Sequence, residues 1–254
     1  MMLNSDHPVS VLHMFNSVAT SDVVLSILVW LGIMQLSWFS VMLARKQVPA
    51  LTLQHSLTPL LSLWVLMWPV YIDSRWLWFG LIALFTMSVL CSQLRAPFWR
   101  QLQYIWTVRE SDTEHGLYPE IQLLPLTQLM SALLFAGIWF QYIPEFGFGL
   151  ALCICLAFPA AYWVDHPAIH QGRFRTLGFP AHPQQTLVGH LVLICVATAL
   201  LSWSLHVYHG TDWSSLFIAT LITAMTASVT RALIPGQWNI PAAMLSMGFM
   251  MWVL

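Results

Sequence analysis

Long apolar runs separated by short polar connections fill the chain from residue 23 to residue 254. A membrane-spanning helix needs roughly 20 mostly apolar residues, and about eight runs come close to that length. The runs are continuously apolar and lack the alternation of membrane-barrel strands, so each is expected to be a helix. The pattern predicts an all-α, polytopic membrane bundle. The predicted spans are 23–44, 55–72, 76–93, 122–143, 146–164, 186–207, 213–231 and 237–254.

Composition agrees with a membrane environment. Of the 254 residues, 58% are hydrophobic and 7% are charged, whereas a soluble domain has about 25% charged residues. Lys46 is the single lysine and no basic face is present, which argues against nucleic-acid binding. No CxxC pair occurs, so neither a disulfide framework nor a zinc site is indicated. The cysteines are expected to be buried thiols: Cys91, Cys153, Cys155 and Cys195.

The chain divides into a polar lead-in, 1–22, and a single transmembrane domain, 23–254. No Lys or Arg precedes Arg45. The first apolar run therefore lacks the basic start of a signal peptide and is expected to remain as a helix.

The positive charges give the orientation of the predicted spans. Eight of the nine basic residues fall in odd-numbered connections, and only Arg75 falls in an even-numbered one. The positive-inside rule makes the odd-numbered side cytoplasmic, with loops 94–121 and 165–185 there and both termini on the other side. A bacterial inner membrane or its equivalent is the expected location. The eight residues are Arg45, Lys46, Arg95, Arg100, Arg109, Arg173, Arg175 and Arg231.

The stretch 94–109 is amphipathic. Its apolar residues recur at helical spacing, and its arginines and glutamines lie elsewhere around the helix, which predicts a helix on the cytoplasmic leaflet. We interpret it as a strut at the membrane surface. The apolar residues are Phe98, Leu102, Ile105 and Trp106.

The stretch 158–189 combines charge, histidine, glycine and proline in an otherwise apolar chain. Asp165 ends the fifth run, and Pro167 predicts a break or kink in the helix beside it. An ionisable residue at such a break is a functional candidate. The alternative is an interfacial aspartate that only ends the span. If the helix continues, Gly172 and Arg173 lie near the same face as Asp165 and leave room for an anionic group.

Three other polar residues lie near span ends on the predicted cytoplasmic side. Glu114 belongs to an acidic loop, and the helix-breaking residues after it would hold it near the mouth of the fourth span. His55 opens the second span, and Arg231 ends the seventh. Each has an ordinary interpretation as a solvated acid, an interfacial histidine or a snorkelling anchor. Each could instead take part in phosphate chemistry.

Four features, taken in order, resemble the membrane-bound CTP-dependent lipid-alcohol kinases, the family of dolichol kinase and phytol kinase. They are Glu-His-Gly followed by Tyr-Pro (114–119), Asp-x-x-Ala-x-x-x-Gly-Arg (165–173), Thr-x-x-Gly (186–189) and Asn-Ile-Pro (239–241). The resemblance covers about residues 110–254. It implies a multi-span helical enzyme that transfers phosphate from a cytidine nucleotide to a polyprenol-, phytol- or dolichol-type alcohol.

The chain also departs from the family pattern. Gln185 stands where the family has Lys, Val188 where it has Glu, and Leu51-Thr52 where it has Arg-Lys. The acid of the penultimate span appears as Thr230 or Arg231, and the last-span Asp-Asn as Gly236-Gln237. These changes remove groups that would handle phosphate and metal, so the resemblance is to a divergent member with altered or lost catalysis.

The resemblance implies a site built for phosphoryl transfer, which depends on positioning and charge neutralisation. No P-loop GxxxxGK occurs, so a soluble-type nucleotide site is not expected. Asp165 and Glu114 are the expected catalytic residues and Mg²⁺ ligands. Gly172, Arg173, Arg175, Arg231 and Gly189 are expected to bind the nucleotide and its phosphates.

Two alternatives remain. His166 and His170 form an HxxxH beside Asp165, a spacing that suits a metal-dependent lipid-modifying enzyme. The other alternative is a lipid-binding or structural membrane subunit that kept the fold without catalysis, which the uncharged Gln185 and Val188 favour.

Overall fold

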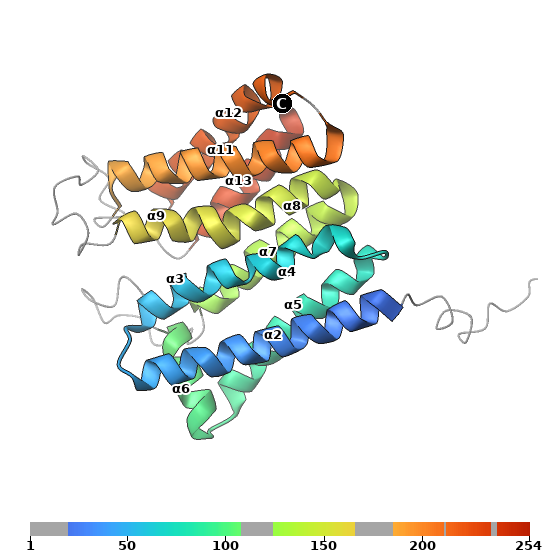
Figure 1. The fold of residues 1–254 in the computed structure, drawn as a ribbon. Coiled ribbons are helices and arrows are strands. Elements are labelled where there is room, and N and C mark those ends of the chain that lie inside the picture. The colour runs from blue at the N-terminus through green and yellow to red at the C-terminus, as the bar shows by residue number, and fades with distance from the viewer. Residues whose placement is uncertain (1–19, 108–123, 166–184, 211, 235–237) are drawn as a thin grey trace, which may run out of the picture.

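Helices and the turns between them make up the part of the chain that the structure describes. The computed structural model describes residues 20–107, 124–165, 185–210, 212–234 and 238–254 (Figure 1). The helices are α2 (Thr20–Arg45), α3 (Ala50–Leu60), α4 (Ser62–Leu66), η1 (Trp68–Val70), η2 (Ser74–Trp76), α5 (Leu77–Gln93), α6 (Pro97–Thr107), α7 (Leu124–Tyr142), α8 (Pro144–Leu152), η4 (Cys153–Ala157), α9 (Phe158–Asp165), α11 (Leu187–His209), α12 (Trp213–Leu233) and α13 (Asn239–Val253).

Five helical stretches are long and apolar enough to cross a membrane, and the shorter α13 is also apolar. The predicted class, an all-helical membrane protein, agrees with this architecture. The number of eight spans stays a prediction. The five stretches are Thr20–Arg45, Ser74–Cys91, Pro144–Asp165, Leu187–His209 and Trp213–Leu233.

The second predicted span, 55–72, is not one helix. The structure divides it between α3, α4 and η1, and α3 begins at Ala50, before the predicted start. Pro59 lies inside α3, where a proline removes one helical hydrogen bond and crowds the preceding turn. The helix is interrupted two residues later, at Leu61, whose N–H donates to Thr58 O at 3.1 Å in a tightened turn.

The first helix also begins earlier than predicted. Thr20 and the fully buried Asp22 belong to α2 rather than to a polar lead-in. The Asp22 carboxylate accepts hydrogen bonds from the backbone N–H groups of Ile72 at 3.1 Å and Asp73 at 3.0 Å. The boundary moves because Asp22 has a partner 50 residues away, which local polarity does not show.

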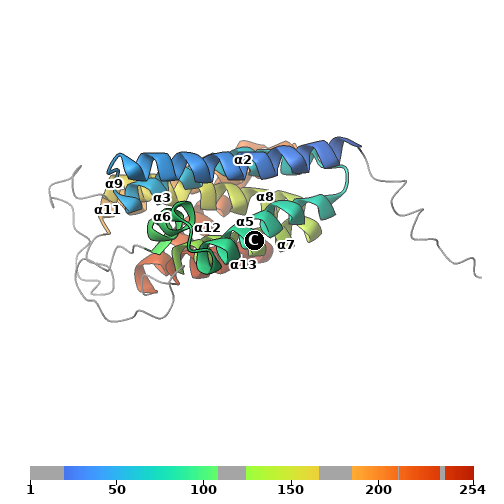
Figure 2. The ribbon, with the colours of Figure 1, turned by 90° about the horizontal axis from the view of Figure 1, so that it is seen from below.

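The helix Pro144–Asp165 lies at the centre of the bundle. In its most apolar stretch 78% of residues are buried, whereas the same measure for α2 is 17%. It packs against α7 and α11, while α12 and α13 cover α11 and α7 (Figure 1). Gly147 lets α8 lie directly against α7, since a Cβ there would overlap the backbone of Phe140. Helix α2 lies on the outer surface in both views (Figure 2).

Polar contacts define two ends of the bundle. At one end Arg45 Nε donates to Gln101 Oε1 at 2.9 Å, joining α2 to α6. At the opposite end the Glu145 carboxylate lies 2.8 Å from His209 Nε2, joining α8 to α11. We call the first the basic end because Arg45, Lys46, Arg95, Arg100 and Arg231 lie there, whereas Arg75 lies at the opposite end. For the described residues, the predicted segregation of positive charge holds.

Candidate functional site

Three helices meet at the Asp165 carboxylate, at the basic end of the bundle. Oδ1 accepts two hydrogen bonds from Thr186, one from the backbone N–H at 2.9 Å and one from the hydroxyl at 2.7 Å. Oδ2 accepts a hydrogen bond from Arg231 Nη2 at 3.0 Å. Only 5% of Asp165 and 7% of Arg231 is exposed. The ends of α9 and α12 and the start of α11 are therefore joined by one buried ion pair.

Thr186 organises the start of α11. It is the N-cap residue, with extended backbone angles, and its hydroxyl oxygen accepts the Gly189 N–H at 3.0 Å. This cap satisfies one of the free N–H groups of the first turn. The hydroxyl hydrogen remains for Asp165. The carboxylate also lies at the N-terminal, positive end of the α11 dipole.

Gly189 is required by the closeness of Asp165. A Cβ at this position would overlap Asp165 Oδ1 and Cγ. Glycine removes the overlap and lets the carboxylate lie against the first turn of α11. The Thr-x-x-Gly sequence thus has a physical explanation, in which threonine binds the carboxylate and glycine makes room for it.

Arg231 compensates the charge of Asp165 in surroundings of low polarity. A buried ion pair is costly to break, because removing one partner leaves the other charge uncompensated. Arg231 Nη1 is also buried and has no hydrogen-bond partner among the described residues.

A second polar contact, between α11 and α12, lies about one turn further from the end. His190 Nδ1 lies 2.8 Å from Ser228 Oγ, and both side chains are buried. Ser228 lies three residues before Arg231, nearly one helical turn, and His190 follows Gly189. The His190–Ser228 contact therefore lies next to the Asp165 cluster, along the α11–α12 interface.

His55 lies against the helix that carries Asp165. Its ring stacks on Tyr162 with a centroid distance of 3.4 Å and an interplanar angle of 14°. Tyr162 is three residues before Asp165 in α9. His55 is thus placed beside the last turn of α9.

The structure brings together three of the predicted site residues, Asp165, Gly189 and Arg231. Sequence analysis gave Thr186 no role of its own, although it lies in the quoted Thr-x-x-Gly, and it missed His190 and Ser228, which sit inside apolar runs. The sequence gives only a weak signal for them, namely one polar residue near the start of the sixth apolar run and another near the end of the seventh. The other predicted residues lie outside the described part of the chain: Glu114, His166, His170, Gly172, Arg173 and Arg175.

The described residues of this site do not by themselves suit a magnesium ion. Both carboxylate oxygens of Asp165 are engaged by protein donors. No group of three or more His, Cys, Asp or Glu side chains suited to a metal occurs in the described ranges. A hard divalent cation needs several oxygen ligands, and here one ion-paired carboxylate is present.

No family model, curated protein or solved structure matches this chain. The interpretation of the site therefore depends on its own residues and geometry.

Proposed function

We propose that the chain is a divergent membrane lipid-alcohol kinase, which transfers a phosphate group from a cytidine nucleotide to a polyprenol-, phytol- or dolichol-type alcohol. One observation carries the proposal. Asp165, Thr186 and Arg231 belong to segments up to 66 residues apart, and they meet at one buried carboxylate. Two of these segments are the Asp and Thr-x-x-Gly pieces of the resemblance, and the third holds the position of its penultimate-span acid.

The reaction needs a group that orients the alcohol and a cation that neutralises phosphate charge. Asp165 is suited to the first role, because a buried carboxylate next to apolar helices can accept a hydrogen bond, and then the proton, from a lipid hydroxyl. Arg231 is suited to the second role, because its guanidinium presents several donors to phosphate oxygens. The lipid oxygen forms the new bond to the terminal phosphorus, the bond to the nucleoside diphosphate breaks, and the proton passes to Asp165.

This use of the site requires the ion pair to open. Arg231 would exchange the Asp165 carboxylate for phosphate oxygens, which frees Asp165 Oδ2 for the alcohol. The unpartnered Nη1 supports the exchange, because a phosphate could satisfy both terminal nitrogens of the guanidinium. Magnesium is expected from the resemblance, with Glu114 as the second ligand. Since the described carboxylate alone does not fit the ion, no step is assigned to it here.

The test is transfer of labelled terminal phosphate from CTP to dolichol, phytol and a bacterial polyprenol by the purified full chain in mixed micelles. We expect labelled lipid phosphate with the unmodified chain. Asp165→Asn should lower the rate at least about a hundredfold, since general-base groups contribute on that order. Asp212→Asn is the matched control, because Asp212 is exposed and caps α12 without a side-chain hydrogen bond. An unchanged transfer rate in Asp165→Asn would show that Asp165 has no catalytic role. If the unmodified chain transfers phosphate to none of the alcohols, the proposed kinase activity is wrong.

A second candidate function is a lipid-binding membrane subunit without catalysis. The ion pair favours it, because Arg231 stands where the resemblance expects an acid and engages the carboxylate that a kinase needs free. This candidate predicts saturable binding of the lipid alcohol by the unmodified chain and no phosphate transfer from CTP or ATP. Phosphorylated lipid product would contradict it.

A further inference from the structure

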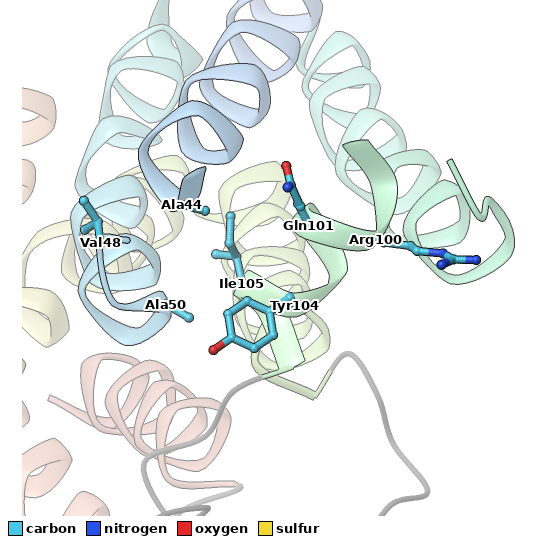
Figure 3. A pocket seen from close by; sticks show the side chains of 7 residues that line it. All are labelled: Ala44, Val48, Ala50, Arg100, Gln101, Tyr104 and Ile105. Carbon is cyan, nitrogen blue, oxygen red and sulfur yellow. The ribbon is translucent and has the colours of Figure 1, made fainter. Parts of the chain in front are cut away.

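A pocket of about 300 Å³ lies at the basic end, between α6 and the connection from α2 to α3 (Figure 3). Gln101, Tyr104 and Ile105 of α6 form one side, and Arg100 lies at the outer edge with its guanidinium directed away from the other lining residues. The opposite side consists of three small or aliphatic residues, Ala44, Val48 and Ala50. The wall is therefore mainly apolar, with polar groups along its rim.

The turn between α2 and α3 makes the pocket. Gln47 has a left-handed backbone, with φ of 63°, and the N–H groups of Lys46 and Gln47 bond back to the last turn of α2 at 3.0 Å. The chain therefore reverses directly after Arg45. This reversal leaves Val48 and Ala50 as a short apolar wall facing α6.

Two polar contacts hold α6 in place as the other wall. Arg45 Nε donates to Gln101 Oε1 at 2.9 Å, and Gln54 Nε2 donates to the backbone oxygen of Ile105. Ile105, on the inner face of α6, is fully buried, whereas Tyr104 is 62% exposed. Both walls are thus fixed to the bundle, and the pocket is already formed without a ligand.

The charges around the pocket are unbalanced. Among the described residues, Arg45, Lys46, Arg95 and Arg100 form no ion pair with a carboxylate. The described acids Asp22, Asp73, Glu145 and Asp212 lie at the opposite end of the bundle, and Asp165 is paired with Arg231. An anionic group at the pocket rim would therefore meet positive potential without competition from described carboxylates.

We propose that this pocket binds an anionic phospholipid from the membrane leaflet at the basic end of the bundle. The lipid phosphate lies at the pocket rim, where the exposed side chains of Arg45 and Arg100 turn toward it, and the first carbons of its acyl chains lie on Ala44 and Val48. A volume of about 300 Å³ is at the small end of ligand pockets, so the remaining acyl chain extends into the surrounding bilayer. Arginine binds phosphate oxygens through its planar fork of donors. Juxtamembrane basic groups are attracted to anionic lipids in general, and the preformed apolar wall adds a defined site. The proposal does not depend on the proposed kinase activity.

Native mass spectrometry of the full chain in detergent, with phosphatidylglycerol and phosphatidylcholine added in equal amounts, tests the site. We expect retention of phosphatidylglycerol over phosphatidylcholine. Arg45→Gln and Arg100→Gln should each weaken phosphatidylglycerol binding about threefold to tenfold, because each removes a charge-assisted contact at an exposed position. Arg75→Gln is the matched control, since it removes the same charge at the opposite end and should leave binding unchanged.

Two further arms separate a lipid site from simple charge attraction. Val48→Trp fills the pocket without changing charge and should also weaken phosphatidylglycerol binding. Excess glycerol phosphate, which carries the head-group charge without acyl chains, should not displace the bound lipid. The proposal is overturned by equal retention of both lipids, by an Arg75→Gln effect as large as that of Arg45→Gln, or by displacement with glycerol phosphate. Circular dichroism of each variant confirms that the helices remain folded.

Discussion

At the scale of single residues, Asp165 and Arg231 each compensate the buried charge of the other. Either residue alone would leave a buried, uncompensated charge, at a cost of about 3–5 kcal/mol. The carboxylate would keep its two Thr186 donors if Arg231 were lost, and Arg231 Nη1 already lacks a partner. Both residues are less than one-tenth exposed, so solvent screens the pair poorly.

This coupling predicts the outcome of a double-mutant cycle. Asp165→Asn and Arg231→Met should each lower the melting temperature in detergent, whereas the double variant should be less destabilised than the two single effects added together. The reason is that removing both partners also removes the uncompensated charge. Tryptophan fluorescence during heating measures the transition. Additive losses would show that the two residues contribute independently and that the ion pair is weak.

Gly189 gives a second prediction at this scale. Gly189→Ala places a methyl group onto Asp165 Oδ1, so the carboxylate must move away from Thr186 or Arg231. We expect a loss of about 1–3 kcal/mol, as for other overpacked sites, together with loss of any phosphate transfer that requires Asp165. Thermal melting and the CTP assay measure the two effects.

The control for Gly189 is Gly32→Ala in α2. No atom lies within 4 Å of a Cβ at position 32, and alanine favours a helix over glycine by about 0.5–1 kcal/mol. This variant should therefore melt at the same temperature or slightly higher. Equal destabilisation by both substitutions would mean that the effect at 189 comes from helix propensity or lipid contact and not from Asp165.

Sequence reasoning found part of this site because composition and motif pointed to the right residues. Asp165 and Arg231 stand out as ionisable residues at the ends of apolar runs, and Gly189 follows from the resemblance. The contact between Asp165 and Arg231 was not predicted, because 66 residues separate them along the chain and no local sequence pattern reports such a long-range contact. His190 and Ser228 were missed for a related reason. Within an apolar run, a buried polar pair looks like two isolated substitutions until the helices are packed.

At the scale of elements, hydropathy predicted the long helices well. The predicted starts of α5 and α12, at 76 and 213, agree with the structure within one residue, because a short polar turn directly precedes each helix. The second span was wrong as a continuous helix. Hydropathy averages over a window, so Pro59 did not change the result, although proline interrupts the backbone hydrogen bonds of a helix.

The start of α2 provides the prediction at this scale. Asp22 is fully buried and accepts the N–H groups of Ile72 and Asp73, which anchors the turn before η2 to the first helix. Asp22→Asn keeps the shape but removes the charge from these bonds, and one amide oxygen replaces two carboxylate oxygens. We expect a loss of about 1–3 kcal/mol in the free energy of unfolding. Thermal melting with Asp212→Asn as the exposed control measures it, and equal melting of both variants would contradict this anchoring role.

At the scale of the whole molecule, the described basic residues are sorted between two ends. Arg45 and Lys46 follow α2 at the basic end, and Arg75 lies in η2 at the opposite end. The separation follows from the helices themselves, because α2 runs from one end of the bundle to the other and η2 is held beside its start by Asp22. With the positive-inside rule, this arrangement predicts that the basic end, and with it Asp165 and the α6 pocket, faces the cytoplasm.

Cysteine labelling from each side of the membrane tests this orientation. Lys46→Cys and Arg75→Cys are matched, because each replaces one exposed positive residue. The native thiols do not interfere. Cys91, Cys153 and Cys155 are buried, as predicted, whereas Cys195 is exposed on the bundle surface, contrary to the prediction. Cys195 lies inside the apolar helix α11, away from its ends, where an impermeant maleimide in water does not reach. In intact cells the reagent should label position 75, and position 46 should be labelled only after the membrane is opened. Labelling of both positions from one side would contradict the two-ended arrangement of α2 and η2. Labelling in the reverse order would keep that arrangement but place Asp165 and the phospholipid pocket on the side away from cytoplasmic CTP, which would exclude the proposed kinase reaction.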